Sequence, residues 1–250
     1  MSRVWSLEIT HNREIAPGIW RLHLGLPADY PQPEAGQFVN LYLNDESRLL
    51  PRPISVCDWE AGVLTLVYAV VGAGTEILSG YGVGTSIRVS SPLGVGFSTE
   101  GVQSCILVGG GVGVPPMLYL AKALMAGGVA DVRAVLGFRQ EPFLADDFPT
   151  TVDIATDDGS VGFRGNVVEL LSQETIPAHA TIFACGPKPM LRALAAFAGE
   201  RGIPLQVSLE ERMGCGYGAC VGCVCKTTDG NRKVCEDGPV FRGDEVIWDD

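Results

Sequence analysis

Basic residues are scarce in this sequence, and their scarcity limits the partners it can have. The 250 residues include 18 Lys and Arg against 29 Asp and Glu, which gives a net charge of −11 at pH 7. Proteins that bind nucleic acid neutralise its phosphates with clustered Lys and Arg, and the sequence contains no such cluster. Nucleic acid is therefore not an expected partner. With 46% hydrophobic and 19% charged residues, the composition is typical of packed globular domains, and the length suffices for about two of them.

The sequence also lacks a segment suited to export or to a membrane. No apolar run of signal-peptide length follows Arg3, so we expect a cytoplasmic protein. The longest uncharged run, residues 101–121, has the length of a membrane span, but it contains several glycines and the pair Pro115-Pro116. These residues would leave backbone polar groups unpaired in lipid. The run is therefore expected to form a buried strand, a tight turn and the start of a helix, and no membrane partner is expected.

Two patterns of predicted elements divide the chain. Up to residue 93, short strands alternate with turns and bury one face each, as Trp20, Leu22 and Leu24 indicate, which predicts a small antiparallel β-barrel or sandwich. After Ser104, strands alternate with helices, which predicts a Rossmann-like parallel sheet with ligand sites at the carboxyl ends of its strands. We expect three units, at 1–100, 101–207 and 208–250. The expected strands are 4–11, 18–26, 37–43, 54–57, 63–71, 86–89, 105–108, 132–138, 152–155 and 181–185, and the expected helices 117–125, 166–171 and 189–200.

Disulfide bonds are not expected, although the chain has eight cysteines. Thiols stay reduced in the cytoplasm, so clustered cysteines indicate metal binding there. Cys215, Cys220, Cys223 and Cys235 give the spacing C-x4-C-x2-C followed by a distant cysteine. This order is typical of plant-type [2Fe–2S] sites. A structural zinc site is the alternative, although zinc more often uses two separated C-x2-C pairs.

Glycines surround these cysteines. Gly214, Gly216, Gly218 and Gly222 would let backbone N–H groups approach the sulfurs without a clash from a Cβ atom. Cys225 is interpreted as a buried small apolar residue and not as a ligand.

A glycine-rich turn follows the predicted strand 105–108. Gly109, Gly110, Gly111 and Gly113 precede a helix, a context in which phosphates contact backbone N–H groups and the helix dipole. The match to the dinucleotide-binding fingerprint is incomplete, because Val114 or Pro116 takes the place of its third glycine. By itself the motif is also compatible with a strained turn that binds no ligand.

Two segments of the first domain carry phosphate-binding chemistry. Arg52-Pro53-Ile54-Ser55 is expected to end a strand, and an arginine suits a pyrophosphate through its planar fork. Gly74-Thr75 is expected to lie in the first turn of a short helix that begins near Gly72, where N–H groups and a hydroxyl are available. Each segment alone is as easily explained by a turn. Their occurrence together with the glycine turn and the cysteine spacing indicates a flavin and nucleotide site.

The order of these motifs resembles that of the ferredoxin-reductase superfamily. Within it, the chain is most similar to the electron-transfer subunits of NAD-dependent dihydroorotate dehydrogenases, because the cysteines follow the nucleotide domain. The similarity covers nearly the whole chain. It rests on residues 52–55, 74–75, 109–116, 156–160, 185–187, 210–235 and 238–241.

The resemblance implies FAD held between barrel and nucleotide domain, NAD on the other side of the flavin ring as a substrate, and a [2Fe–2S] cluster that faces a partner. Two departures affect the flavin site: Ile54 stands where many superfamily members have an aromatic residue, and Ala69 where relatives often have arginine. The cofactor-binding residues implied are Arg52, Pro53, Ile54, Ser55, Val67, Tyr68, Ala69, Gly74, Thr75, Gly109, Gly110, Gly111, Gly113, Cys185, Gly186 and Pro187, and the cluster ligands are the four cysteines named above.

The resemblance also implies an electron route. NAD exchanges a hydride whereas a cluster passes single electrons, so a flavin must stand between them. The implied path runs from dihydroorotate to FMN on a catalytic partner subunit, then through the cluster and FAD to NAD⁺, in pyrimidine biosynthesis. The implied assembly is a heterotetramer with two copies of each subunit. No catalytic acid or base is expected, and His11, His23 and His179 are interpreted as packing or surface residues.

Two other functions share these motifs. One is a flavin and iron–sulfur subunit that oxidises NAD(P)H for a hydrogenase or transhydrogenase-type complex. The other is an iron–sulfur redox sensor with no enzymatic activity. The choice of NAD over NADP rests on the resemblance, because both Arg139 and Glu141 follow the second strand of the predicted sheet.

Overall fold

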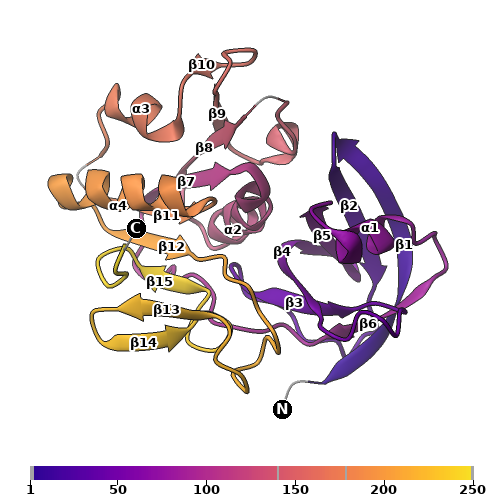
Figure 1. Cartoon of the computed structure of the whole chain (residues 1–250). Coiled ribbons are helices and arrows are strands. Elements are labelled where there is room, and N and C mark those ends of the chain that lie inside the picture. Colours follow the sequence, from indigo (N-terminus) through magenta and orange to yellow (C-terminus); the bar gives the residue numbers. More distant parts are fainter. Residues whose placement is uncertain (1–2, 140, 178, 249–250) are drawn as a thin grey trace.

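The N-terminal part of the chain forms a closed barrel of antiparallel strands (Figure 1). The computed structural model describes residues 3–139, 141–177 and 179–248. Around the barrel the strand order is β1-β2-β5-β4-β3-β6, which confirms the predicted barrel. A short helix, α1 (Ala73–Ser79), follows β5. The strand bounds are Val4–Ala16 (β1), Ile19–Gly25 (β2), Phe38–Tyr42 (β3), Arg52–Glu60 (β4), Val63–Ala69 (β5) and Ser86–Ser90 (β6).

Alternation of apolar side chains builds the barrel core. In β1, Trp5, Leu7 and Ile9 are buried while their neighbours face solvent. Leu22 and Leu24 of β2 are likewise fully buried, as the sequence pattern predicts. Successive residues of a strand point to opposite faces, so one apolar residue in two fills the barrel interior.

The rest of the chain is built on a seven-stranded sheet with the order β10-β9-β8-β7-β11-β12-β15. All neighbours pair in parallel except β15, which is antiparallel to β12. Helix α2 packs between the sheet and the barrel, and α3 and α4 cover the other face (Figure 1). The strand bounds are Ser104–Gly110 (β7), Asp131–Phe138 (β8), Thr151–Thr156 (β9), Phe163–Arg164 (β10), Ala180–Cys185 (β11), Leu205–Ser208 (β12) and Val240–Arg242 (β15), and the helix bounds are Val114–Ala126 (α2), Val167–Ser172 (α3) and Lys188–Arg201 (α4).

Several element bounds differ from those expected. The segment that begins at Arg52 starts β4 and does not end a strand, because Arg52 already pairs with Leu41 of β3. Strand β1 continues to Ala16, since it pairs with β2 along its whole second half. Helix α2 begins at Val114, three residues early, because prolines in a first helical turn need no N–H partner.

The C-terminal segment returns to the nucleotide sheet. It contains a hairpin of β13 (Val224–Thr227) and β14 (Gly230–Lys233), and then β15. Val207 of β12 pairs with Phe241 of β15, so this last strand is part of the sheet. The sequence pattern did not predict β10, β12, β13, β14 or β15, because each has only two to four residues.

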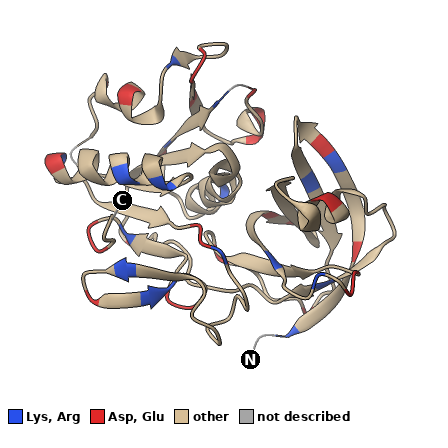
Figure 2. Ribbon diagram, in the orientation of Figure 1, with Lys and Arg blue, Asp and Glu red and all other residues tan. Residues whose placement is uncertain are grey.

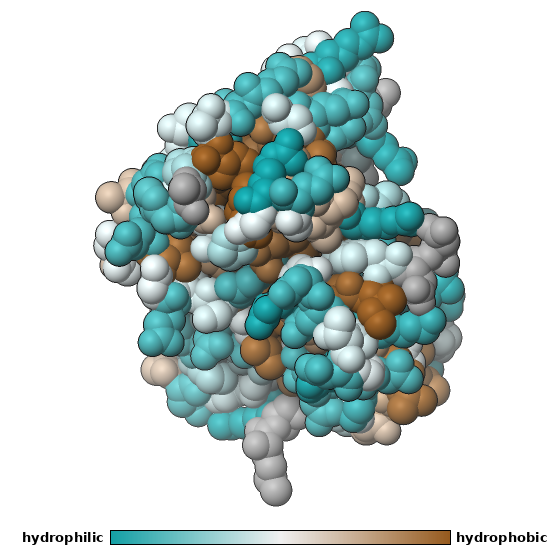
Figure 3. All heavy atoms as spheres, turned by 90° about the vertical axis from the view of Figure 1, so that its left-hand side faces the viewer, coloured by the Kyte–Doolittle hydropathy of each residue, from teal (hydrophilic) through white to brown (hydrophobic). Residues whose placement is uncertain are grey.

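Charged residues of both signs and apolar residues are interspersed over the surface that Figures 2 and 3 show. Lys and Arg are scattered over the ribbon with Asp and Glu between them (Figure 2). The face that carries α3 and α4 shows apolar residues as separate patches among hydrophilic ones (Figure 3). Within the described part of the chain, none of the helices has the length and hydropathy needed to cross a membrane.

Polar and apolar contacts join the barrel to the sheet domain. Lys122 of α2 forms an ion pair with Asp58 of β4 (2.5 Å), and Arg21 of β2 pairs with Asp147 in the connection after β8. The hydroxyl of Tyr119 donates to the carbonyl oxygen of Pro33 (2.7 Å). A shared apolar cluster lies beneath these contacts. The two parts are therefore packed in a fixed arrangement that leaves a cleft between them.

Gly113 is predicted to be essential to the packing of the glycine turn against the end of β11 within the sheet domain. A Cβ atom there would lie 2.6 Å from the backbone nitrogen of Gly186, so Gly113→Ala must displace main chain. We expect a loss of about 1–3 kcal/mol in the free energy of unfolding, measured by denaturant titration. Gly199→Ala is the matched control, because a Cβ atom at that exposed position of α4 meets no atom within 4 Å. An equal loss in both variants would contradict the packing argument.

Candidate functional site

Arg52 opens β4, and its side chain lies against helix α1. A Cβ atom at Gly74 would overlap the Arg52 guanidinium, so the guanidinium packs directly against the backbone of α1 at this glycine. The hydroxyl of Thr75 accepts from the N–H of Val71 (3.0 Å) and donates to the carbonyl oxygen of Gly72 (3.0 Å). These bonds fix the first turn of α1. The structure therefore brings together the two segments that the sequence singles out for a flavin phosphate.

The predicted flavin-site residues of β5, Val67 to Ala69, face two different environments. Val67 packs against the sheet domain, and Ala69 lines the cleft between the domains. Tyr68 points the other way, into the barrel core, where its hydroxyl donates to Oδ1 of Asn12 (3.1 Å). Only the main chain of Tyr68 can therefore face a ligand in the cleft.

The remaining residues of the Arg52 motif are half-buried. Pro53, Ile54 and Ser55 follow one another along β4 and pair with β3. Ile54 packs against the barrel core, so this position supplies an aliphatic surface in place of an aromatic ring.

Close backbone packing shapes the glycine turn. Gly110 lies against the turn after β11, where a Cβ atom would be 2.6 Å from Sδ of Met190. Gly109 packs on α2 in the same way, 2.9 Å from Cα of Val114. Gly111 differs, because it has a φ of 53° and nothing lies within 4 Å of its Cβ position. Gly111 thus exposes its backbone to the cleft, as a phosphate-binding turn requires.

A cleft of about 980 Å³ lies between barrel and sheet, at the carboxyl ends of the parallel strands. Of the residues expected to bind nucleotide, Gly110, Gly111 and Pro187 line it. Gly109, Gly113, Cys185 and Gly186 are not among its lining residues, and the Cys185 side chain is buried. The lining also includes Ala16, Pro17, Ile19, Ala69, Val71, Phe138, Phe143, Asn166, Met190 and Glu210.

Charged side chains stand at two places in the cleft. Arg139, Glu141 and Asp157 lie where β8 and β9 end, in the region that contacts the ribose in sheets of this type. Glu210 stands beside Pro187. Desolvation by its surroundings raises the pKa of the Glu210 carboxyl, although its side chain is open to the cleft. Glu210 is not among the predicted site residues, although it begins the segment 210–235 on which the resemblance rests.

The four predicted cluster cysteines gather in the loop between β12 and β15. Cys215 lies beside Cys220, and Cys223 packs with Cys235 in one apolar cluster. Backbone N–H groups also point at the sulfurs. Cys220 donates to Sγ of Cys215 (3.3 Å), and Gly218 donates to Sγ of Cys235 (3.2 Å).

The two pairs differ in environment. Cys223 and Cys235 are buried, whereas Cys215 and Cys220 are half-buried. Burial raises the pKa of the Cys235 thiol to about 12. Burial also acts against ionisation at Cys215, but N–H groups of Tyr217 and Cys220 outweigh it and lower the pKa of Cys215 to about 7. Such N–H···S bonds stabilise thiolates.

Cys225 lies apart from these pairs. It is half-buried in β13 and lines a separate cavity of about 330 Å³ with Lys188 and Trp248. Burial raises the pKa of its thiol to about 11. The expectation of full burial was therefore too strong, because one side of this short hairpin faces the cavity.

The barrel contacts the cluster loop through Asn40 of β3. Its Nδ2 donates to the carbonyl oxygen of Cys215 (3.0 Å). Gly216 has a φ of 77°, and a Cβ atom there would lie 2.7 Å from Oδ1 of Asn40. The sequence analysis missed Asn40, although a polar residue inside the apolar run Phe38–Tyr42 is a possible signal.

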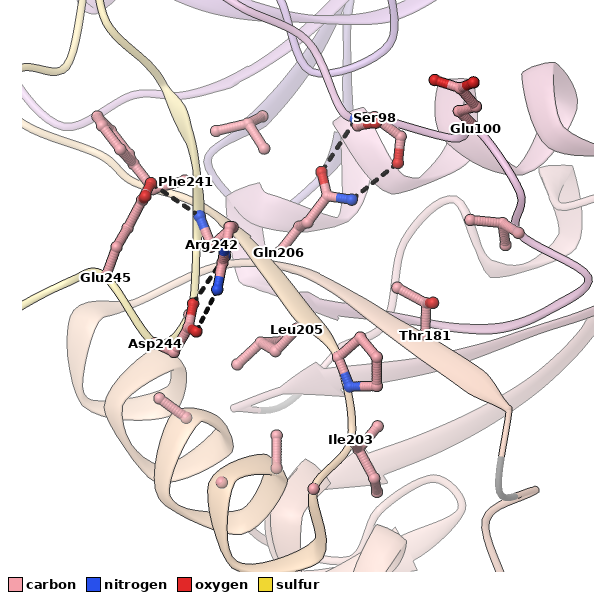
Figure 4. Close-up of a pocket in the computed structure, with 18 of the residues that line it drawn as sticks. Ser98, Glu100, Thr181, Ile203, Leu205, Gln206, Phe241, Arg242, Asp244 and Glu245 are labelled. Carbon is pink, nitrogen blue, oxygen red and sulfur yellow. Dashed lines mark hydrogen bonds and ion pairs between the residues drawn. The ribbon is translucent and has the colours of Figure 1, made fainter.

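A second large cavity, of about 840 Å³, lies at the opposite ends of the strands (Figure 4). Two of its polar side chains pair with neighbouring groups. The amide of Gln206 contacts the main chain of Ser98 through both its oxygen (2.9 Å) and its nitrogen (2.7 Å), and Arg242 pairs with Asp244. Of the segments that the sequence singles out, only 238–241 reaches this cavity, through Val240 and Phe241, and none of the predicted cofactor-binding residues lines it.

No three His, Cys, Asp or Glu side chains of residues 3–139, 141–177 and 179–248 form a group arranged to hold one metal ion.

The chain is similar to proteins of known family and to solved structures. Residues 210–247 match the model of the iron-sulfur cluster binding domain of dihydroorotate dehydrogenase B. A structure of NADH-dependent reduced ferredoxin-NADP oxidoreductase superposes with a TM-score of 0.86 at 31% identity, over 97% of this chain and 90% of that chain. Phthalate dioxygenase reductase, with a TM-score of 0.66 at 20% identity over 90% and 87% of the chains, shares the fold.

Curated relatives match along the whole length. The electron transfer subunit of dihydroorotate dehydrogenase B (NAD(+)) from Shouchella clausii is 41% identical, over 96% of this chain and 97% of the relative. The subunit of the same name from Caldanaerobacter subterraneus subsp. tengcongensis is 36% identical, over 98% and 99%. At such identity and coverage the chain belongs to the family of electron transfer subunits of NAD-dependent dihydroorotate dehydrogenase B.

Proposed function

We propose that this chain is an oxidoreductase subunit that transfers electrons from a dihydroorotate-oxidising catalytic subunit to NAD⁺ in pyrimidine biosynthesis. The catalytic subunit contains FMN, and the assembly is a heterotetramer with two copies of each subunit. FAD and a [2Fe–2S] cluster are the resident cofactors and NAD is the substrate. When bound, the flavin exchanges hydride and single electrons, and the cluster exchanges single electrons.

The gathering of the four cysteines in one loop, with backbone N–H groups directed at their sulfurs, is the observation that carries this proposal. Each iron of a [2Fe–2S] cluster takes two protein thiolates, and the loop places Cys215 beside Cys220 and packs Cys223 with Cys235. N–H groups directed at these sulfurs fit a site that holds negative sulfur atoms. We assign these four residues as the cluster ligands and exclude Cys225.

The flavin-binding role falls to residues on the barrel side of the cleft. Arg52 is held against Gly74, and together with Thr75 it would bind the FAD pyrophosphate. Pro53, Ile54 and Ser55, with Val67, Ala69 and the main chain of Tyr68, would line the rings and the ribityl chain. The segment 71–72 can add backbone contacts where Val71 lines the cleft.

The nucleotide-binding role falls to the sheet side. Gly110, Gly111 and Pro187 would contact NAD directly. Four other predicted residues would support the site without touching NAD, because they hold the glycine turn against the start of α4. They are Gly109, Gly113, Cys185 and Gly186. Binding and orientation are then the tasks of this chain, and no proton transfer by a side chain is required.

The three expected units are retained as functional units. Residues 1–100 would bind FAD, 101–207 NAD and 208–250 the cluster, with β15 shared between the last two because it completes the sheet. The cytoplasm is the proposed compartment. Reduced thiols, which the cluster needs, persist there, and all eight cysteines are free.

Replacing a single cluster ligand should abolish electron transfer to the partner subunit and leave the NADH-to-dye activity at FAD. In Cys220→Ser the cluster is lost, while FAD still passes electrons from NADH to a dye, because Arg52 and the glycine turn are untouched. Cys225→Ser is the matched control, since that thiol lies in another cavity, and it should keep the full iron content. Iron analysis, the visible spectrum and the two activities measure the outcome. Full coupling to the partner in Cys220→Ser would refute the assignment.

Co-purification distinguishes the proposed assembly from its alternatives. We expect the native chain to elute with an FMN-containing barrel subunit, and flavin analysis of the complex to find FAD and FMN in equal amounts. A hydrogenase-like or glutamate-synthase-like partner would instead favour an NAD(P)H-oxidising subunit of a hydrogenase or transhydrogenase-type complex. Purified material without FAD and without NADH-dependent dye reduction would favour the redox sensor.

Glu141 and Asp157 should make the enzyme prefer NADH to NADPH. Their carboxylates repel a 2′-phosphate, although Arg139 offsets part of the effect. Glu141→Gln should therefore raise the ratio of kcat/KM for NADPH to that for NADH by about fivefold to tenfold, a typical effect of one nearby charge. Glu100→Gln, in the cavity at the opposite end of the strands, should leave the ratio unchanged. An unchanged ratio in Glu141→Gln would place the discrimination elsewhere.

A further inference from the structure

Asn40 is a polar residue inside an apolar strand. It lies in the middle of β3 and its exposed fraction is 0%. Its Oδ1 has no hydrogen-bond partner among the residues that the structure describes. A buried amide with an unpaired oxygen costs stability relative to an apolar side chain of the same size. The residue is therefore not explained by the stability of the barrel, and its N–H groups are the part of the side chain that is used.

Those N–H groups reach the cluster loop. Nδ2 of Asn40 donates to the carbonyl oxygen of Cys215, the first of the paired cysteines (3.0 Å). The loop is adapted to this contact at Gly216, since any Cβ atom there would run into the Asn40 amide. Two adjacent residues of the loop thus rest on one barrel side chain.

The same residue is joined to the flavin-binding strand. Asn40 pairs with Pro53, the second residue of the Arg52 motif on β4. Its backbone N–H donates to Oγ of Ser90 in β6 (2.9 Å), which fixes its position from the other side. The segment that would hold the flavin and the loop that would hold the cluster are therefore in contact through one residue.

We infer that Asn40 is a positioning residue, which holds Cys215 and its cluster at a fixed distance from the flavin through the Nδ2 hydrogen bond. This inference rests on the proposed function and adds a residue to it. Groups that orient a metal ligand without touching the metal change metal affinity or activity by about tenfold to a hundredfold when they are removed. Such groups usually bond to the side chain of the ligand, whereas Asn40 bonds to the backbone carbonyl oxygen of Cys215.

The experiment compares Asn40→Leu with Tyr30→Phe in the purified complex. Leucine keeps the approximate size of asparagine and removes the donor. Tyr30→Phe removes a buried hydrogen bond of the same barrel, from Oη to the carbonyl oxygen of Ser90 (2.8 Å), without reaching the loop. The measurements are iron content, the EPR spectrum and midpoint potential of the cluster, Tm, and the rate of cluster reduction by NADH relative to that of FAD.

We expect Asn40→Leu to slow cluster reduction relative to FAD reduction by about tenfold and to alter the EPR spectrum and the potential. Its Tm should fall no further than that of Tyr30→Phe, which should retain wild-type cluster properties. Loss of iron from Asn40→Leu alone would also support the inference. Asn40→His, whose Nδ1–H can donate from the same position, should restore the relative rate at least in part.

Two results would overturn the inference. One is an Asn40→Leu complex with the wild-type spectrum, potential and relative rate. The other is equal changes in Asn40→Leu and Tyr30→Phe, which would indicate a general effect of barrel stability. A wild-type complex without a cluster signal would instead overturn the proposed function, so the two failures are distinguishable.

Discussion

The antiparallel pairing of β12 with β15 is the interaction on which the arrangement of the site depends. It makes the whole cysteine segment a loop between two neighbouring strands of the nucleotide sheet. The ends of that loop are held by the N–H of Leu209, which donates to the carbonyl oxygen of Pro239 (2.9 Å), and by that of Val95, which donates to Gly238 (2.6 Å). This short edge strand thereby helps to hold the cysteine loop against the barrel, where Asn40 contacts Cys215 across 175 positions of the chain.

Much of the fold can be predicted from the sequence because its signals are local. Alternating apolar residues identify the barrel strands, and the glycine turn after an apolar strand identifies the start of the nucleotide sheet. The cysteine spacing is similarly local, since three of the four thiols fall within nine residues. Signals of this kind depend on neighbours in the chain, and the structure agrees with them apart from shifts at the ends of elements.

Contacts between distant segments could not be predicted in this way. Asn40 and Cys215 are 175 positions apart, and only the folded chain shows that they touch. Tyr68 belongs to a segment that borders the cleft, yet its side chain turns into the barrel because residues alternate along β5. Strand β15 has three residues, too few for a periodic pattern, and β12 supplies the partner that defines it.

The unequal environments of the two thiol pairs connect the cluster to the fold. Cys223 and Cys235 belong to the apolar cluster beneath α4, so their side chains contribute to packing even as thiols. Burial penalises the thiolate form of Cys235 there, so that a cation is needed to compensate its charge. Backbone N–H groups already favour the thiolate form of Cys215. Bound iron would supply at Cys235 the compensation that the backbone supplies at Cys215, and binding of the metal and ordering of the loop would then stabilise each other.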